Sequence, residues 1–219
     1  MGNKTDLIVI SGFGDKGVHE LTQHLEELIE PKRTTIVKGC PWYRAMEHPE
    51  TIIERIYQEI RTLSPEELII VGHSYGALLA LAVATRLEVE NVLKQLILID
   101  GPLNSYTDVA PAKLAHHIFY EQYRNRVKIA LACEEALRQM DTTKITTICG
   151  QEDRIVPFEA KLLPRFQEVI VGEDEEGNPL VNNEITVTGR NLILRKTKKF
   201  RGHGLEQKIP DIVKIIAQL

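Results

Sequence analysis

The chain has 219 residues, 43% of them hydrophobic, which suits a single domain built around one core. Its formal net charge of −4 provides no field that would attract nucleic acid or an anionic membrane, and no apolar run is long enough to cross a bilayer. Three cysteines without metal-ligand spacing, and a polar start that lacks a signal-peptide core, lead us to expect a cytoplasmic protein without a metal.

Apolar segments of strand length alternate with helical patterns along the chain. Buried strands are predicted at residues 6–11, 34–38, 68–71, 95–99, 144–149 and 168–171. Helices are predicted around residues 21–28, from residue 49, over 75–88, over 111–140 and over 209–219. This alternation predicts one α/β domain over residues 1–219, with a mostly parallel sheet and helices on both faces. Residues 172–179 predict a surface loop, and residues 181–188 and 191–198 predict an inserted β-hairpin.

Residues 72–76 read Gly-His-Ser-Tyr-Gly and lie between the predicted strand at 68–71 and the helix that follows it. In a sharp strand-to-helix turn, a serine in this pattern is lifted clear of the backbone, where its hydroxyl can act as a nucleophile. Glycine is needed two residues before it and two after it, because a Cβ there would meet the neighbouring strand or helix. Ser74 is therefore the predicted nucleophile.

The loop after the first predicted strand reads Gly-Phe-Gly-Asp-Lys-Gly at residues 12–17, a pattern also found in dinucleotide-binding sites. Such a site needs an acidic residue at the end of the next strand, but that strand ends Ile-Val-Lys-Gly at residues 36–39. In serine hydrolases of this layout, an early loop and the residue after the nucleophile supply the oxyanion-hole N–H groups. We therefore predict the backbone N–H groups of Phe13 and Tyr75 as the donors, and no cofactor.

A serine hydroxyl needs a base, and the chain order in this layout is serine, acid, histidine. Three histidines follow Ser74, and two of them, His116 and His117, lie in a predicted helix. The third, His203, lies in the Gly-His-Gly loop at residues 202–204, which lets an imidazole reach over the carboxyl edge of the sheet. His203 is the predicted base.

Two aspartates are candidates for the acid that orients this base. Asp153 lies just past the predicted strand at 144–149, and Asp100 ends the predicted strand at 95–99. Either carboxylate could orient His203 and stabilise its imidazolium form. We predict Asp153, with Asp100 as the alternative.

Three segments together resemble the α/β-hydrolase superfamily: residues 72–80 (Gly-His-Ser-Tyr-Gly-Ala-Leu-Leu-Ala), 151–157 (Gln-Glu-Asp-Arg-Ile-Val-Pro) and 202–204. Within it, Ser-Tyr-Gly-Ala and the run Ile-Asp-Gly-Pro-Leu-Asn-Ser-Tyr at 99–106 resemble the thioesterase domains of fatty acid, polyketide and nonribosomal peptide synthases. The animal fatty acid synthase type implies Asp100 as the acid, whereas the wider superfamily implies Asp153. The chain retains both.

The resemblance implies hydrolysis of an acyl thioester, bound to a small molecule or to a carrier protein, in fatty acid or polyketide metabolism. It also implies that residues 103–141 form a helical lid over an acyl-chain pocket, although apolar residues at helical spacing are also explained by simple packing. A carboxylesterase acting on oxygen esters would use the same residues and is the alternative. A non-catalytic binding module on this fold is a third interpretation, against which the intact serine and histidine argue.

Residues 195–201 read Arg-Lys-Thr-Lys-Lys-Phe-Arg and form a basic cluster. One interpretation is a solvated strand edge, which lysines protect from aggregation. The other is a docking site for an acidic acyl carrier protein or for the phosphates of coenzyme A. Nothing else in the chain is strongly basic, so we expect no nucleic-acid partner.

Overall fold

The computed structural model describes residues 4–13, 17–40, 47–87, 91–105, 120–151, 153, 156–181, 189–194 and 205–219, with the backbone alone at residues 120–124. Within them, seven strands form one sheet in the order β2-β1-β3-β4-β5-β9-β6. The strands are β1 (Thr5–Ser11), β2 (Arg33–Lys38), β3 (Glu67–His73), β4 (Leu93–Ile99), β5 (Ile145–Gly150), β6 (Gln167–Ile170) and β9 (Arg190–Leu194). All six pairings between them are parallel, which confirms the predicted α/β sheet.

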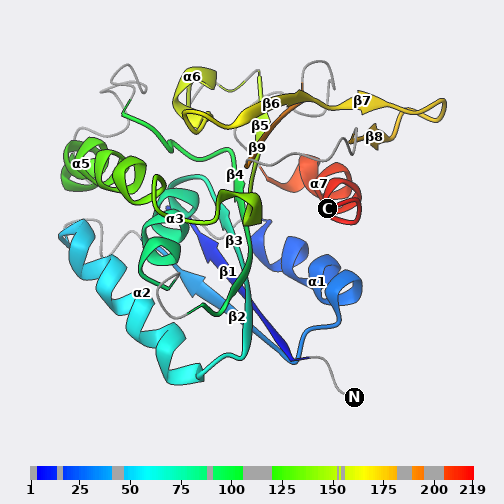
Figure 1. The fold of residues 1–219 in the computed structure, drawn as a ribbon. Coiled ribbons are helices and arrows are strands. Elements are labelled where there is room, and N and C mark those ends of the chain that lie inside the picture. The colour runs from blue at the N-terminus through cyan, green and yellow to red at the C-terminus, as the bar shows by residue number, and fades with distance from the viewer. Residues whose placement is uncertain are drawn as a thin grey trace.

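Helices lie on both faces of this sheet (Figure 1). One face carries α2 (Pro49–Leu63), α3 (Tyr75–Leu87) and α5 (Tyr120–Ala136), and the other carries α1 (Val18–Ile29) and α7 (Ile209–Ile216). Three short helical elements are also described: α6 (Phe158–Lys161) and the 3₁₀ helices η3 (Thr142–Lys144) and η5 (Glu206–Lys208). Within the described ranges, no helix is both long and apolar enough to span a membrane.

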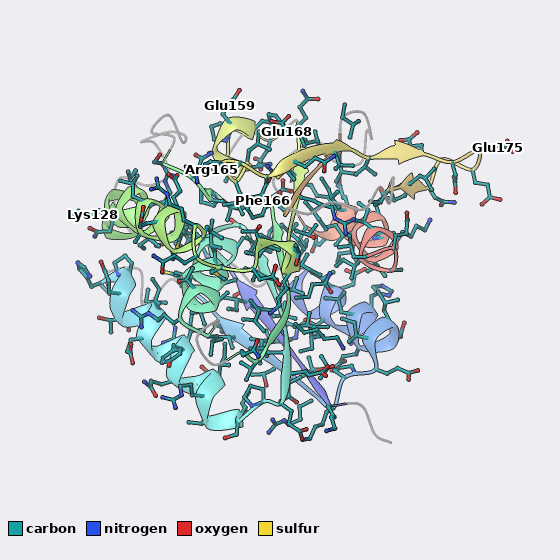
Figure 2. All side chains as sticks on the ribbon, viewed as in Figure 1. Lys128, Glu159, Arg165, Phe166, Glu168 and Glu175 are labelled. Atoms are coloured by element: carbon teal, nitrogen blue, oxygen red, sulfur yellow. The ribbon has the colours of Figure 1, made fainter. Side chains whose placement is uncertain are left out.

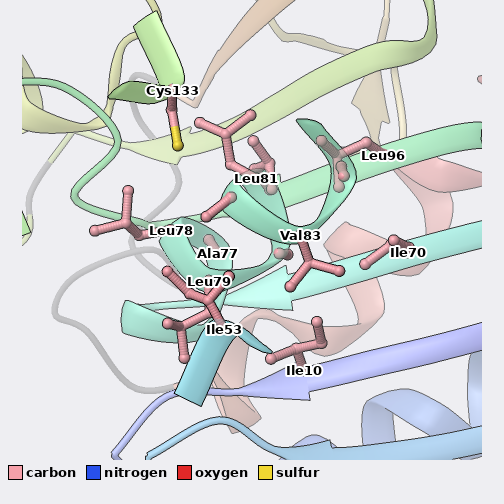
Figure 3. Close-up of a cluster of buried hydrophobic side chains, with 14 of the residues drawn as sticks. Ile10, Ile53, Ile70, Ala77, Leu78, Leu79, Leu81, Val83, Leu96 and Cys133 are labelled. Atoms are coloured by element: carbon pink, nitrogen blue, oxygen red, sulfur yellow. The ribbon is translucent and has the colours of Figure 1, made fainter. Parts of the chain in front are cut away.

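The core is divided by the sheet into two apolar layers. Alternate residues of β3 serve different layers: Ile70 packs with α2 and α3, whereas Ile69 and Val71 pack with α1 and α7. A strand covered on both faces is apolar at every position, which explains the unbroken run at residues 68–71. Figure 3 shows the α3 layer, in which Val83 of α3 lies next to Ile70 of β3 and Leu79 of α3 lies next to Ile53 of α2.

The amphipathic helix α2 covers α3 from outside. Its isoleucines at 52, 53, 56 and 60 recur at helical spacing and are all buried, as their period in the sequence indicates. Pro49 occupies the first turn, where the missing N–H costs nothing. The predicted helix start at residue 49 is therefore confirmed.

The late hairpin lies at a different place from the predicted one. Residues 191–194, expected within its second arm at 191–198, instead belong to β9, which pairs in parallel with β5 on one side and β6 on the other. Residues 182–188 of the expected first arm at 181–188 lie outside the described residues. The observed hairpin joins β7 (Gly172–Glu173) to β8 (Pro179–Leu180), across the segment predicted as a surface loop. Its tip, near Glu175, extends away from the body of the molecule (Figure 2).

The predicted lid at 103–141 is described in part. Helix α5 occupies 17 residues of it, and residues 106–119 lie outside the described chain. The lid, and the assignment of residues 1–219 to one domain, stay predictions.

Candidate active site

Ser74 lies at the turn between β3 and α3 and has a left-handed backbone, with φ of 56°. Such a conformation is uncommon for a residue with a Cβ and persists only where its surroundings impose it. Here the Ser74 N–H donates to the carbonyl oxygen of Ile99 on β4 at 2.9 Å, and the Ser74 carbonyl accepts from Ala77 N–H at 2.9 Å. The turn is thus held from both sides in the geometry of a nucleophile elbow.

The two glycines of the motif are required by crowding. A Cβ on Gly76 would lie 2.4 Å from the carbonyl oxygens of both Ile10 and Ser11, and a Cβ on Gly72 would lie 2.6 Å from the Cα of Ala77. Real Cβ atoms do not approach backbone atoms so closely. The close packing of α3 against β1 and β3 therefore explains the Gly-x-Ser-x-Gly spacing.

The loop after β1 reaches the elbow. A Cβ on Gly12 would lie 3.1 Å from both the Cβ of Ser74 and the backbone nitrogen of Tyr75. The ring of Phe13 stacks on the ring of Tyr75, with centroids 4.7 Å apart and planes 13° apart. The two predicted oxyanion-hole residues therefore lie side by side next to the serine, and their role as donors stays a prediction.

Asp100 follows β4 and is also left-handed, with φ of 47°. Its buried carboxylate accepts hydrogen bonds from three donors: Gly150 N–H at 2.9 Å and Lys161 Nζ at 2.5 Å on Oδ1, and Lys208 Nζ at 2.5 Å on Oδ2. Burial alone would raise the pKa of Asp100, but the charges of Lys161 and Lys208 outweigh it and lower this pKa to about 2. Asp100 is therefore an ionised carboxylate held between two lysines.

Asp153 follows β5, and its side chain is buried as well. Its Oδ2 pairs with Lys161 Nζ at 2.8 Å, and its Oδ1 accepts from Val156 N–H at 3.2 Å. Lys161 thus bridges the two candidate acids, which the sequence had left as alternatives. Burial alone would lower the pKa of Lys161, but Asp100 and Asp153 raise it above its usual value, so the bridge is charged.

His203, the predicted base, and the basic cluster at 195–201 lie outside the described residues, so both stay predictions. The described chain resumes at Leu205, two residues after His203, and enters η5, which carries Lys208. Within the described ranges, no group of three or more metal-ligating side chains is gathered in one place.

Sequence reasoning missed Lys161 and Lys208. Each is fully buried, whereas lysines are almost never buried unless they are paired. The available signal was local and weak: Lys161 lies between Ala160 and two leucines, and Lys208 lies directly before Ile209. Both lysines reach Asp100 from far away in the sequence, across 61 and 108 residues, so local spacing does not identify this contact.

The parallel sheet together with the serine elbow between β3 and α3 defines the α/β-hydrolase fold. Within that class, the chain belongs to the PGAP1-like alpha/beta domain family, whose sequence model matches residues 35–185.

Several solved structures share the fold at low sequence identity. One, described under "LipS and LipT, two metagenome-derived lipolytic enzymes", has a TM-score of 0.67 and 12% identity, over 100% of this chain and 94% of that one. Est1E from Butyrivibrio proteoclasticus has a TM-score of 0.63 and 14% identity, over 100% and 87% of the two chains. A thioesterase domain from the curacin biosynthetic pathway has a TM-score of 0.58 and 15% identity, over 100% and 91%. No curated protein sequence matches the chain.

Proposed function

We propose that this protein is a serine hydrolase that cleaves acyl esters through an acyl-serine intermediate on Ser74. The observation that carries the proposal is the left-handed Ser74 at the β3–α3 turn, with the Gly12–Phe13 loop directly against it. A strained serine beside the two predicted oxyanion-hole residues, Phe13 in this loop and Tyr75 at the start of α3, suits acyl transfer, because attack and charge stabilisation occur at one carbonyl.

In the proposed first half-reaction, Ser74 Oγ attacks the acyl carbonyl carbon while His203 accepts the hydroxyl proton. The C–O bond to the enzyme forms, and the negative charge on the carbonyl oxygen is stabilised by the N–H groups of Phe13 and Tyr75. Each such donor is typically worth about 3 kcal/mol of transition-state stabilisation. Collapse of the intermediate breaks the bond to the leaving thiol or alcohol, which takes the proton from His203.

The second half-reaction returns the enzyme to its starting state. His203 removes a proton from water, the resulting hydroxide attacks the acyl carbonyl, and the bond to Ser74 Oγ breaks with return of the proton. The products are a free carboxylic acid and the thiol or alcohol. No organic cofactor is needed for either step.

We propose Asp153 as the acid that orients His203. Asp100 accepts hydrogen bonds from two ammonium groups and a backbone N–H, so about three of its four acceptor sites are occupied by groups other than the histidine. Asp153 lies just past β5 in the segment 151–157, the place of the acid that the resemblance to the wider superfamily implies. Changing Asp153→Asn is expected to lower kcat by about 10³- to 10⁴-fold, and Asp100→Asn by much less. Equal losses in the folded variants would contradict this assignment.

Acyl thioesters are the substrate class that we propose first, on the residues at 72–80 and 99–106 that resemble synthase thioesterases. A thioesterase domain among the structural neighbours supports this choice. Oxygen esters are the second class, supported by the lipolytic and esterase neighbours. Comparing kcat/KM for acyl-coenzyme A and p-nitrophenyl esters of matched chain length separates the two. A carrier-protein donor is tested with Lys198 and Lys199 changed to Glu, which should lower kcat/KM for the carrier-bound substrate alone.

A fluorophosphonate probe tests the reaction class directly. It should label Ser74 in the folded wild-type protein, and Ser74→Ala should remove both the label and ester hydrolysis. A folded wild-type protein that does not react at Ser74 would contradict the proposed function.

A further inference from the structure

We propose that Lys161 is a positioning residue, which fixes the Asp153 carboxylate by clamping it against Asp100. The inference rests on the proposed function for its catalytic consequence, and on the geometry of four buried charges for the positioning itself. These charges come from separate segments: Asp100 from the end of β4, Asp153 from the segment after β5, Lys161 from α6 and Lys208 from η5.

The ammonium group of Lys161 has a partner for each of its three protons. They are Asp100 Oδ1 at 2.5 Å, Asp153 Oδ2 at 2.8 Å and the carbonyl oxygen of Gly150 at 2.9 Å. An ammonium group has three N–H donors and no acceptor, so this set satisfies it completely. Because the side chains of Lys161 and both aspartates are fully buried, water cannot substitute for any of these contacts.

The backbone on both sides of Lys161 is held by hydrogen bonds from Leu103 and Asn104. The side-chain amide of Asn104 donates to the carbonyl oxygens of Glu159 at 2.5 Å and Leu162 at 2.8 Å, one on each side of Lys161. The Leu103 N–H adds a bond to the carbonyl of Ala160 at 2.7 Å. The side chain of Glu159 is exposed and points outward (Figure 2). Helix α6 therefore places Glu159 in solvent and Lys161 in the interior.

The backbone of Leu163, two residues after Lys161, is held by the side chain of Asn191. Asn191 on β9 accepts from Leu163 N–H at 3.1 Å and donates to the Leu163 carbonyl at 3.0 Å. Its Oδ1 also accepts from the Thr147 hydroxyl at 2.8 Å. The lysine therefore reaches the acid from a backbone that is tied to both β5 and β9.

Among the described residues of the clamp, positive and negative charges are equal in number. Two carboxylates, Asp100 and Asp153, face two ammonium groups, Lys161 and Lys208. The nearby thiol of Cys149 stays neutral, because burial raises its pKa to about 12. Removing Lys161 alone would take the buried ammonium group away from Asp153 and leave two buried carboxylates near each other with one positive charge fewer. The Asp153 carboxylate is then expected to turn away from its observed position.

A double-mutant cycle tests whether Lys161 acts through Asp153. With p-nitrophenyl butyrate as substrate, Lys161→Met should lower kcat about 10- to 100-fold, the range known for groups that hold a catalytic ligand, and should change KM less than about threefold. In an Asp153→Asn background the same change should lower kcat by less than about threefold, because the residue through which it acts is already altered. An equal fractional loss in both backgrounds would overturn the proposal.

Arg33→Met is the matched control. It also removes a cation from a buried aspartate, Asp6, but at the far end of β1. Its effect on kcat should be small and equal in the two backgrounds. Should Lys161→Met fail to fold, the double variant Asp100→Asn/Lys161→Met removes one charge of each sign and keeps the cluster balanced; it should show the same loss of kcat.

A crystal structure of Lys161→Met, or of the balanced double variant, gives a readout that does not depend on activity. The Asp153 carboxylate should no longer accept from Val156 N–H. A carboxylate in its original position would overturn the positioning role, whether or not the protein hydrolyses esters. A displaced carboxylate in the variant, together with a folded wild-type protein that hydrolyses no ester, would instead contradict the proposed function and leave the positioning role supported.

Discussion

Asp100 and Asp153 occupy equivalent places in the sequence, since each lies just past a buried strand, and they have different surroundings in the structure. The resemblance to the thioesterase of animal fatty acid synthase implied Asp100 as the acid, and the resemblance to the wider superfamily implied Asp153. The difference arises from Lys161 and Lys208, which reach Asp100 across 61 and 108 residues of chain. A choice that depends on such distant partners has no signature in local sequence, which is why both aspartates stayed open at that stage.

The burial of Asp100 between two lysines makes stability depend on pH. Its folded-state pKa of about 2 lies below the value near 4 expected in the unfolded chain. This ion cluster therefore stabilises the protein in full above pH ~4, and its contribution of about 2 kcal/mol is lost as the pH falls toward 2. Urea unfolding between pH 2 and 6 should show the decrease.

The balanced variant Asp100→Asn/Lys208→Met is the comparison for this pH dependence. It should unfold with a smaller loss of free energy between pH 4 and pH 2 than the wild-type protein, because the titrating carboxylate is gone. The same decrease in both proteins would assign the pH dependence to other carboxylates.

The glycine requirement of the elbow is a separate residue-scale prediction. Gly76→Ala places a Cβ 2.4 Å from two carbonyl oxygens of β1, so it should destabilise the fold by about 3 kcal/mol. Gly172→Ala is the control, because its nearest new contact is at 3.8 Å. Thermal unfolding measures both, and a similar midpoint for the two variants would contradict the steric explanation.

Elements that carry a continuous apolar run or a clear helical period were predictable, and β9 was not. The runs that became β1, β3 and β4 are covered on both faces, so their composition alone indicates buried strands. Residues 191–198 alternate and follow Gly189-Arg190, and this pattern predicted a hairpin arm. Asn191 is instead buried, with its amide satisfied by Thr147 and Leu163. Such compensation appears only when the partner strands are known.

Helix α3 provides the element-scale prediction. It is apolar on nearly all sides because it lies between the sheet and the outer helices α2 and α5. Leu79→Ala should therefore cost about 2–5 kcal/mol of unfolding free energy, the range for a fully buried leucine. Leu131→Ala on α5 should cost less than about 0.5 kcal/mol, because Leu131 is 51% exposed. Chemical denaturation of both variants tests the difference.

For the whole molecule, the superfamily fold was predictable because it is set by strand alternation and by one motif at a strand end. The finer thioester assignment depends on residues that line the acyl site, and these follow from side-chain packing that periodicity does not specify. The position of the hairpin was likewise missed, because β7 and β8 are each two residues long.

The two apolar layers should unfold together. Neighbouring residues of β3 belong to opposite layers, so neither layer can be lost while the sheet persists. Leu21→Ala on α1 removes a leucine from the layer that does not contain α3, and it should still shift the loss of fluorophosphonate labelling at Ser74 as much as the loss of helical circular dichroism. Separate midpoints for the two signals would contradict a single cooperative unit.

The strand order has a consequence for synthesis on the ribosome. Strand β6 precedes β9 in the chain, yet β9 lies between β6 and the rest of the sheet. During translation, β1 to β5 can therefore pair first. Strand β6 cannot pair with the sheet until β9, which is translated about 20 residues later, has left the ribosome. We expect truncated chains that end before residue 190 to present Ile148 and Val169 to chaperones, and release of the last 30 or so residues to close the sheet.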